Sequence, residues 1–435
     1  MMQASPVAHG KPLRSLGLSV LATLACLAAP PAAGAAEGGA WTGTWAASPQ
    51  PPIPAGAARY DNQTLRLIVH TSLGGRKVRV QLSNRYGDAP VTLGAAHVAR
   101  RAGEADIVPQ SDRTLTFRGR AALTLPPHGS ATSDPVDLDV PARGDLAVSL
   151  YLPGPSLIDS THILAKQTSY VSPAGDQTGA ASFPAAKKIR AWPLLARVDV
   201  AGGPSAGALV AFGDSLVDGD GSSTDRNARW TDQLATRLQS AGLNVGVLNA
   251  GLIGNRLLRS SPGATHPEIG AAFGPAGLER VGPDALDLAG VRWIVLRIGT
   301  NDLADPGALS PASESVTADD LLSGLRRLAE LAHRRRVKVI GATIPPFEGA
   351  AIVPGMWSAE KEATRLRVND AIRGDRAYDA VIDLDRLLRD PDHPSRLDPR
   401  IDSGDHIHPN DEGYRRLADA FPLEVIASNR PHSGP

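Results

Sequence analysis

A serine stands three residues after the end of an unbroken apolar run, at the place where a buried strand would end. The run is "ALVAF", residues 208–212, and Gly213-Asp214-Ser215 follows it. A loop serine usually hydrogen-bonds to its own backbone. It becomes a nucleophile when a neighbouring base can take its proton. A base, and a group that orients the base, must therefore be found elsewhere in the chain.

The base is expected near the C-terminus, in the stretch "SGDHIHPND" (403–411), where Asp405 precedes His408 by three residues. This spacing lets one tight turn aim the carboxylate at Nδ1 of the imidazole, which leaves Nε2 free to accept a serine proton. Pro409 disfavours helix at His408 and keeps the histidine in a loop. Ser215 is thus a candidate nucleophile, His408 a candidate base and Asp405 a candidate for the residue that orients the base.

Two further stretches supply hydrogen-bond donors. They are "NAGLIGN" (249–255) and "GTND" (299–302), and each follows an apolar run. The backbone N–H of Gly254 and the amide of Asn301 suit a developing oxyanion, where one donor contributes roughly 3–4 kcal/mol. In an open parallel sheet, ligands bind beyond the carboxyl ends of the strands. We therefore expect all of these groups to meet at one edge of a sheet.

The elements that would position these groups form an alternating pattern. Apolar runs predict strands at 208–212, 245–250, 291–298, 337–344 and 380–384. Between them, residues 230–240 and 318–335 carry apolar side chains at helical spacing. Near-continuous apolar strands linked by helices indicate a parallel sheet covered on both faces. The Gly- and Pro-rich stretch 256–290 is interpreted as a wall of the site rather than as a packed element.

The N-terminal half has a different pattern of apolar residues. "TLRLIVHTS" (64–72) and "KVRVQLSN" (77–84) resemble strands, and "LGGR" (73–76) between them predicts a hairpin. Further short apolar runs follow at short intervals, separated by Pro, Gly and Asp, and no helical period interrupts them. The pattern predicts an all-β, sandwich-like domain at 41–203. The α/β domain is then expected at 206–428.

Residues 1–36 have the features of a secretory signal peptide. Lys11 and Arg14 precede an apolar stretch that ends in a string of small residues. No twin arginine precedes this stretch, so we expect export by the general secretory route and a secreted or periplasmic protein. The single cysteine, Cys26, lies inside the segment, which leaves the mature chain without a thiol. No later run predicts an integral membrane segment in the mature chain.

Net charge excludes one class of partner. Lys plus Arg number 45 and Asp plus Glu number 45, so the formal net charge is zero. Without a positive field, the sequence does not predict binding to nucleic acid. The expected partner is a small molecule or a polymer that reaches the polar loops beyond the strands.

Four blocks of the second half resemble those of the SGNH hydrolases, the GDSL-type esterases and lipases. In order along the chain, they are Gly213-Asp214-Ser215-Leu216, Gly254, Gly299-x-Asn301-Asp302 and Asp405-x-x-His408. The resemblance covers about residues 208–427. It implies a flavodoxin-like, three-layer hydrolase domain with Ser215, His408 and Asp405 as a catalytic triad. It also implies an oxyanion hole formed by the N–H of Ser215 with Gly254 and Asn301, and neither a cofactor nor a metal.

The N-terminal half, which opens with "WTGTWAASPQPP", resembles the β-rich region of some secreted bacterial members, including arylesterases and xylan-acting esterases. Two positions depart from related patterns. Val217 stands where the nucleophile elbow of α/β-hydrolases has a glycine, which argues against that fold. His406 stands where the SGNH family often has glycine, and it would crowd or gate the site.

The resemblance implies a serine esterase that works through an acyl-enzyme. Aromatic residues make up only 4% of the chain, and the segments after the strands are rich in small and polar residues. This composition favours short-acyl, acetyl-type esters of carbohydrate-like alcohols, either small molecules or polysaccharides. A broad-specificity arylesterase or lipase of the same mechanism is the alternative.

Two other classes of function are also compatible with parts of the sequence. His406 and His408 lie beside Asp402 and Asp405 and could form the metal cluster of a metal-dependent amidase. No other strand end offers a histidine or clustered carboxylates to complete such a cluster. A non-catalytic carbohydrate-binding protein is the second class. Such a protein would be expected to have lost a member of the triad, and all three members are present.

Overall fold

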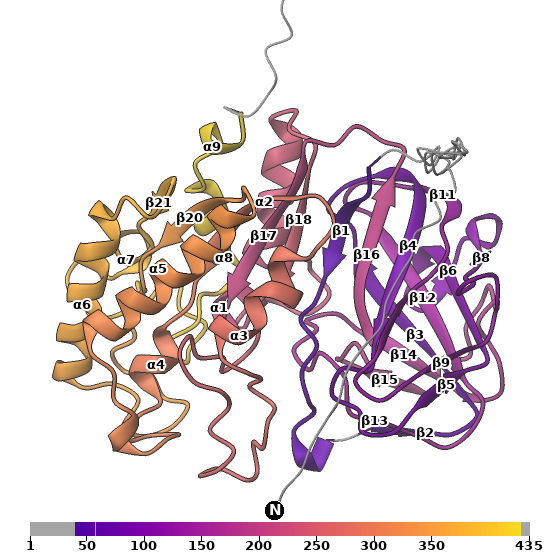
Figure 1. Cartoon of the computed structure of the whole chain (residues 1–435), viewed down its shortest axis with the longest axis horizontal. Helices are drawn as coiled ribbons and strands as arrows, with labels where there is room; N and C mark the ends of the chain where they lie inside the picture. The colour runs from indigo at the N-terminus through magenta and orange to yellow at the C-terminus, as the bar shows by residue number, and fades with distance from the viewer. Residues whose placement is uncertain (1–39, 57, 428–435) are drawn as a thin grey trace, which may run out of the picture. The chain divides into compact units, whose positions relative to one another are not determined.

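The computed structural model describes residues 40–56 and 58–427 (Figure 1). The signal peptide predicted for residues 1–36, with Cys26, lies outside the described residues. Within the described ranges, no helix is both long and apolar enough to cross a bilayer.

All described residues belong to one compact unit, which begins with a strand-rich region at residues 42–201. Its first antiparallel sheet consists of β1 (Thr42–Ala46), β16 (Leu195–Ala201), β4 (Gly75–Ser83) and β10 (Ser130–Thr132), with β11 (Val136–Val140) beside β4. The second consists of β15 (Lys187–Ile189), β14 (Ser169–Ala174), β3 (Gln63–His70), β12 (Asp145–Leu152), β6 (Ala95–Gly103) and β7 (Asp106–Ile107), with β8 (Arg113–Thr114) beside β6. Two short pairs are β13 (Ser156–Ile158) with β2 (Ala58–Tyr60) and β5 (Val91–Leu93) with β9 (Leu123–Leu125). The short 3-10 helices η1 (Pro54–Gly56) and η2 (Pro109–Ser111) lie between strands.

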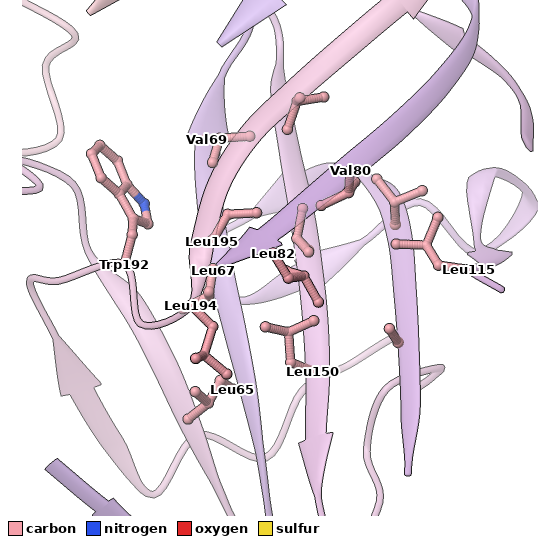
Figure 2. Close-up of a cluster of buried hydrophobic side chains, with 14 of the residues drawn as sticks. Leu65, Leu67, Val69, Val80, Leu82, Leu115, Leu150, Trp192, Leu194 and Leu195 are labelled. Atoms are coloured by element: carbon pink, nitrogen blue, oxygen red, sulfur yellow. The ribbon is translucent and has the colours of Figure 1, made fainter. Parts of the chain in front are cut away.

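Apolar side chains from both sheets share one core (Figure 2). Alternate residues of β3, namely Leu65, Leu67 and Val69, lie in the same cluster as Val80 and Leu82 of β4. The cluster continues through Leu115, Leu150, Trp192, Leu194 and Leu195. The N-terminal half is therefore a β-rich region whose two sheets bury their apolar side chains together.

The predicted hairpin between β3 and β4 is wrong. The two strands are consecutive along the chain, but β3 pairs with β12 and β14, whereas β4 pairs with β16, β10 and β11. Gly74 and Gly75 lack the positive φ that a two-residue hairpin turn requires. A Cβ at either position would lie 2.8 Å from a backbone carbonyl, that of Val140 or Ala201. These glycines allow close backbone contact where the chain passes from one sheet to the other.

The C-terminal half contains a five-stranded parallel sheet in the order β18-β17-β19-β20-β21. The strands are β17 (Gly207–Gly213), β18 (Val245–Ala250), β19 (Val291–Arg297), β20 (Lys338–Ala342) and β21 (Ala380–Ile382). All five lie where the apolar runs predicted strands. This strand order is that of flavodoxin-like sheets, in which the chain reverses direction across the sheet at the first strand. Loops that follow β17, β18 and β19 therefore meet at the carboxyl edge.

Helices alternate with these strands along the chain (Figure 1). They are α1 (Ser215–Asp218), α2 (Trp230–Ser240), α3 (Gly277–Val281), the π-helical turn η3 (Gly282–Leu286), α4 (Thr300–Ala304), the 3-10 turn η4 (Ala312–Glu314), α5 (Ala318–Arg334), α6 (Ala359–Gly374), α7 (Leu384–Leu388), α8 (Asp411–Asp419) and α9 (Glu424–Ala427). The predicted helices 230–240 and 318–335 correspond to α2 and α5.

The stretch 256–290 is a packed part of the fold. It contains α3 and η3, and Leu257, Val281 and Ala285 lie in the hydrophobic cluster on one face of the parallel sheet. The interpretation of this stretch as an unpacked excursion is wrong. Its glycines and prolines obscure the helical spacing of the apolar residues, which was the only signal that the sequence offered for a packed element.

Candidate active site

Ser215 is the first residue of helix α1, directly beyond the carboxyl end of β17. The turn before it depends on Gly213, because a Cβ there would lie 2.0 Å from the carbonyl oxygen of Arg297 on β19. Asp214 caps the helix, and its Oδ1 accepts from the N–H of Leu216 at 3.2 Å. The serine is 9% exposed, so the turn around it is packed and only a small part of the residue is accessible.

A buried ion pair anchors the same turn. Nη1 of Arg297 lies 2.5 Å from Oδ2 of Asp214, and both side chains are almost inaccessible to solvent. Burial raises the pKa of Asp214, while the charge of Arg297 opposes this change. Asp214 therefore holds the turn with both carboxylate oxygens: one accepts from the backbone N–H of Leu216, and the other pairs with Arg297 of β19.

The three predicted triad residues form a continuous chain of hydrogen bonds. Nε2 of His408 lies 2.7 Å from Oγ of Ser215, and Nδ1 of His408 lies 2.6 Å from Oδ2 of Asp405. A carboxylate at Nδ1 keeps the proton on that nitrogen, so Nε2 accepts from the serine hydroxyl. The arrangement can remove the proton from Ser215 as its oxygen attacks.

Asp405 is held in place by its own turn. Its Oδ1 accepts from the N–H of Ile407 at 3.0 Å and of His408 at 2.8 Å. Burial works against the charged form of this carboxylate. The hydrogen bonds and the charge of the imidazole outweigh that effect and hold the pKa of Asp405 well below its usual range. The residue stays ionised at the pH values where a histidine acts as base.

Gly254 lies in a tight turn after β18. Its φ of 69° is left-handed, and a Cβ would lie 2.3 Å from the ring of Phe273, so both conformation and space require glycine. The neighbouring N–H groups are occupied, that of Ile253 by Oδ2 of Asp218 at 3.0 Å and that of Asn255 by the Leu252 carbonyl at 3.1 Å. Within the described ranges, the N–H of Gly254 donates to no protein acceptor. It is available to a ligand.

Asn301 lies in the first turn of α4, beyond the end of β19. Its Nδ2 donates to the carbonyl of Asn255 at 2.9 Å, which attaches it to the residue after Gly254. An amide nitrogen carries two hydrogens, so one remains for a ligand. Hydrogen bonds thus link the three triad residues directly to one another. Asn301 is linked to Gly254 through Asn255, the next residue in the chain.

Asp302 braces the same loop. Its two oxygens accept from the N–H groups of Leu257 at 2.7 Å and of Leu258 at 2.9 Å. Burial raises the pKa of this carboxyl to about 6, although the two N–H donors oppose the change. The aspartate of the third block is therefore a structural partner of the chain that follows Gly254.

His406 is turned toward a different carboxylate from His408. Its Nδ1 lies 2.5 Å from Oδ2 of Asp402, its ring is half exposed, and its φ is 65°. A left-handed φ explains why glycine suits this position. Within residues 40–56 and 58–427, no group of three or more His, Cys, Asp or Glu side chains is arranged to hold a metal ion.

The sequence analysis did not predict that residues of the β-rich region contact the segment that follows Ser215. His162 and Lys166 of the β-rich region contact Asp218 and Asp220, which follow Ser215 in the chain. No local pattern could have found these pairs, because their members lie more than fifty residues apart and meet only through tertiary packing.

Arg280 is the other missed residue. Its guanidinium is fully buried and donates to the carbonyls of Gly213 at 2.5 Å and Ala250 at 3.0 Å. It also lies over the ring of Phe212 at 4.2 Å. Arg280 therefore ties together the carboxyl ends of β17 and β18, where the two site loops begin. A lone arginine within a Gly- and Pro-rich stretch carried no signal of this role.

Comparisons with known proteins bear on the same half of the chain. The model of the GDSL-like lipase/acylhydrolase family matches residues 211–416. No curated protein matches the sequence.

Among solved structures, the aryl esterase of M. smegmatis is 20% identical, with 51% of this chain and 99% of that chain covered and a TM-score of 0.38. The lipase/acylhydrolase from Enterococcus faecalis is 18% identical, with 52% and 100% covered and a TM-score of 0.37. A GDSL-like lipase from Bacteroides thetaiotaomicron is 16% identical, with 52% and 90% covered and a TM-score of 0.36.

The matched residues include every predicted site residue, from Ser215 near the start of the match to His408 near its end. The chain therefore carries a GDSL-like lipase/acylhydrolase domain, and the protein is a carboxylic ester hydrolase.

Proposed function

We propose that the protein is a serine esterase in which Ser215 attacks the ester carbonyl and His408 acts as the general base. The observation that carries the proposal is the hydrogen-bonded series from Ser215 Oγ through His408 to Asp405, at 2.7 and 2.6 Å. His408 then donates the proton to the leaving alcohol, and an acyl-enzyme remains on Ser215. Water, activated by the same histidine, hydrolyses the acyl-enzyme and restores the serine.

The oxyanion of each tetrahedral intermediate would be bound by three donors. They are the N–H of Ser215, the N–H of Gly254 and the amide of Asn301. Two features support this assignment: Gly254 donates to no protein acceptor among the described residues, and Asn301 is fixed by its bond to Asn255. Donors held in place before the reaction stabilise charge without reorganisation.

The proposed substrates are short-acyl esters, acetyl esters above all, of carbohydrate-like alcohols. The residues around the triad are polar: Asp220 and Lys166 on one side, and Asp402 with His406 on another. Of the described large apolar side chains, only Ile53, Ile352 and Leu366 are exposed. A lipase that binds long chains generally needs a broad apolar face, which three scattered residues do not provide. An arylesterase or lipase of broad specificity remains the alternative.

The proposal also includes the architecture of the β-rich region and the location of the protein. The shared core of the two antiparallel sheets supports a sandwich-like interpretation of the β-rich region. The charged and apolar pattern of residues 1–36 supports export to the periplasm or the medium.

Two measurements on the purified protein test the proposal. The first compares Ser215→Ala with the natural chain on a chromogenic acetyl ester, with and without a chelator. We expect a loss of kcat of about 10⁴-fold or more, and little further loss when His408→Ala is added, because triad members act as a unit. Substantial activity in Ser215→Ala would overturn the mechanism, and inhibition by the chelator would favour metal-dependent hydrolysis.

The second measurement is kcat/KM for a series of acyl chains on one chromogenic alcohol. We expect a maximum at acetyl and a steady decline with length. A maximum at eight carbons or more would overturn the acetyl preference and support the lipase alternative, while the serine mechanism would stand.

A further inference from the structure

We infer that Asp220 is a second carboxylate that faces the base His408, and that Lys166 of the β-rich region neutralises it and so sets the pH at which His408 works. The inference rests on the serine-esterase function proposed above. Asp220 and Lys166 act through the histidine, so they are positioning residues rather than catalytic ones.

The carboxylate of Asp220 lies beside the triad. Its Oδ2 is 4.0 Å from Nδ1 of His408, the nitrogen that Asp405 also contacts. The backbone of Asp220 is held at both ends: its N–H donates to the carbonyl of Ser215 at 3.0 Å, and its carbonyl accepts from the hydroxyl of Tyr414. Asp220 therefore keeps a fixed position relative to both the nucleophile and the base.

Lys166 supplies the opposite charge from the other half of the chain. Its Nζ lies 3.1 Å from Oδ1 of Asp220, and its side chain is mostly buried. The second oxygen of the carboxylate is the one that approaches the imidazole. The ammonium and the imidazole thus share one carboxylate, one at each oxygen.

The segment that carries Lys166 is fastened to the loop after Ser215. The carbonyl of Lys166 accepts from the N–H of Asp225 at 3.0 Å, and the carbonyl of Ala165 accepts from Arg229 at 2.5 Å. Gln167 and Thr168 also donate to the carboxylate of Asp225, at 3.0 Å and 2.6 Å. These bonds hold the backbone that carries Lys166 next to the loop that carries Asp220.

The direction of each effect follows from the charges around His408. Asp405 faces the imidazole from its own loop, Asp220 from the segment after α1, and Asp214 lies behind Ser215 as the partner of Arg297. The Asp402–His406 pair lies on the same loop as His408. A carboxylate near an imidazole favours the protonated ring and raises its pKa, and a neighbouring cation has the opposite effect.

Removal of Lys166 should therefore leave the negative charge of Asp220 uncompensated beside the imidazole. The acidic limb of kcat/KM reports the ionisation of the free base. In Lys166→Met we expect this limb to move to higher pH by about half a unit to one unit. In Asp220→Asn we expect it to move to lower pH by a similar amount. The double variant should lie near the natural enzyme, because both charges are gone.

Two further variants separate charge from structure. Lys166→Arg keeps the cation, so its acidic limb should stay within about 0.2 pH units of the natural enzyme. Lys77→Met is the matched control, because Lys77 forms an exposed pair with Asp137 at 2.8 Å in the first sheet of the β-rich region. In Lys77→Met we expect the acidic limb of kcat/KM to stay where it is in the natural enzyme.

The experiment has a readout that a merely structural role would not move. If Lys166→Met lowers kcat/KM equally at every pH and leaves the limb in place, the inference is wrong. A second readout is the NMR titration of the His408 imidazole, identified by its loss in His408→Gln, in the natural chain and in Lys166→Met. If no ester is hydrolysed at all, the proposed function fails, but the comparison of the two NMR titrations still decides whether the ammonium of Lys166 acts on His408.

Discussion

Nε2 of His162 lies 2.9 Å from Oδ1 of Asp218, the last residue of the helix that begins with Ser215. Nδ1 of the same imidazole lies 3.0 Å from the carbonyl of Ser48, which can only accept, so this nitrogen carries a proton. The other oxygen of Asp218 accepts from the N–H of Ile253, next to Gly254 in the chain. One buried pair thus joins the β-rich region to the nucleophile helix and to the turn that would bind the oxyanion.

The first prediction concerns the stability contributed by this pair. In His162→Ala the carboxylate of Asp218 remains buried without its partner, and we expect a loss of about 3–5 kcal/mol in the free energy of unfolding. Urea titration followed by fluorescence measures it. His128→Ala is the control, because the His128–Asp88 pair is exposed and should contribute less than about 1 kcal/mol. Equal losses in the two variants would contradict the role of His162.

The second prediction concerns the pH dependence of stability. Burial opposes protonation of His162, but the charge and hydrogen bond of Asp218 prevail and raise its pKa in the folded protein. The pair therefore stabilises the fold fully below the pKa of an unfolded histidine, about 6.5. This contribution is lost as the pH rises through the folded pKa. The difference in Tm between the natural chain and His162→Gln should therefore shrink as the pH rises through the folded pKa of His162. A difference that stays constant with pH would contradict a charged His162.

Much of the chemistry could be predicted because it follows local rules. The carboxyl ends of parallel strands must meet, so Ser215, Gly254 and Asn301 follow β17, β18 and β19 at one edge. The three-residue spacing of Asp405 and His408 fits in one turn. These relationships depend on neighbours in the chain and on the strand order, both of which the apolar pattern reveals.

The rest depends on contacts that no local pattern encodes. Helix α6 was not predicted, because two of its few buried residues are Arg365 and Asn369, and its apolar stripe is correspondingly weak. The hairpin between β3 and β4 was predicted from a Gly-Gly pair whose real function is close backbone contact. Lys166 reaches the site only because the β-rich region packs against the loop after Ser215.

The third prediction separates the two histidines of the last block. His408→Ala should be almost inactive, because the serine loses its base. His406→Gly should keep most of its activity, because glycine adopts the left-handed φ of 65° without strain. The lost ring bonds to Asp402 and takes no part in the hydrogen bonds of the triad. The measurement is kcat on an acetyl ester, with and without a chelator. Loss in both variants together with chelator sensitivity would point to metal chemistry instead.

The last prediction concerns Asn301, whose amide is bonded to the carbonyl of Asn255. If the remaining hydrogen of Nδ2 binds the oxyanion, Asn301→Ala removes a donor that acts mainly in the transition state. We expect kcat to fall by about 10²–10³-fold while KM changes little.

The control for this variant is Asn84→Ala. Asn84 is also buried and donates to backbone carbonyls, but these belong to Ala89 and Pro126 in the β-rich region. Both variants should lower Tm, because each leaves buried carbonyls without a donor. Only Asn301→Ala should lower kcat at a temperature where both are folded. If the two variants lose kcat equally, or if Asn301→Ala changes KM alone, the amide is a structural bond and not part of the oxyanion hole.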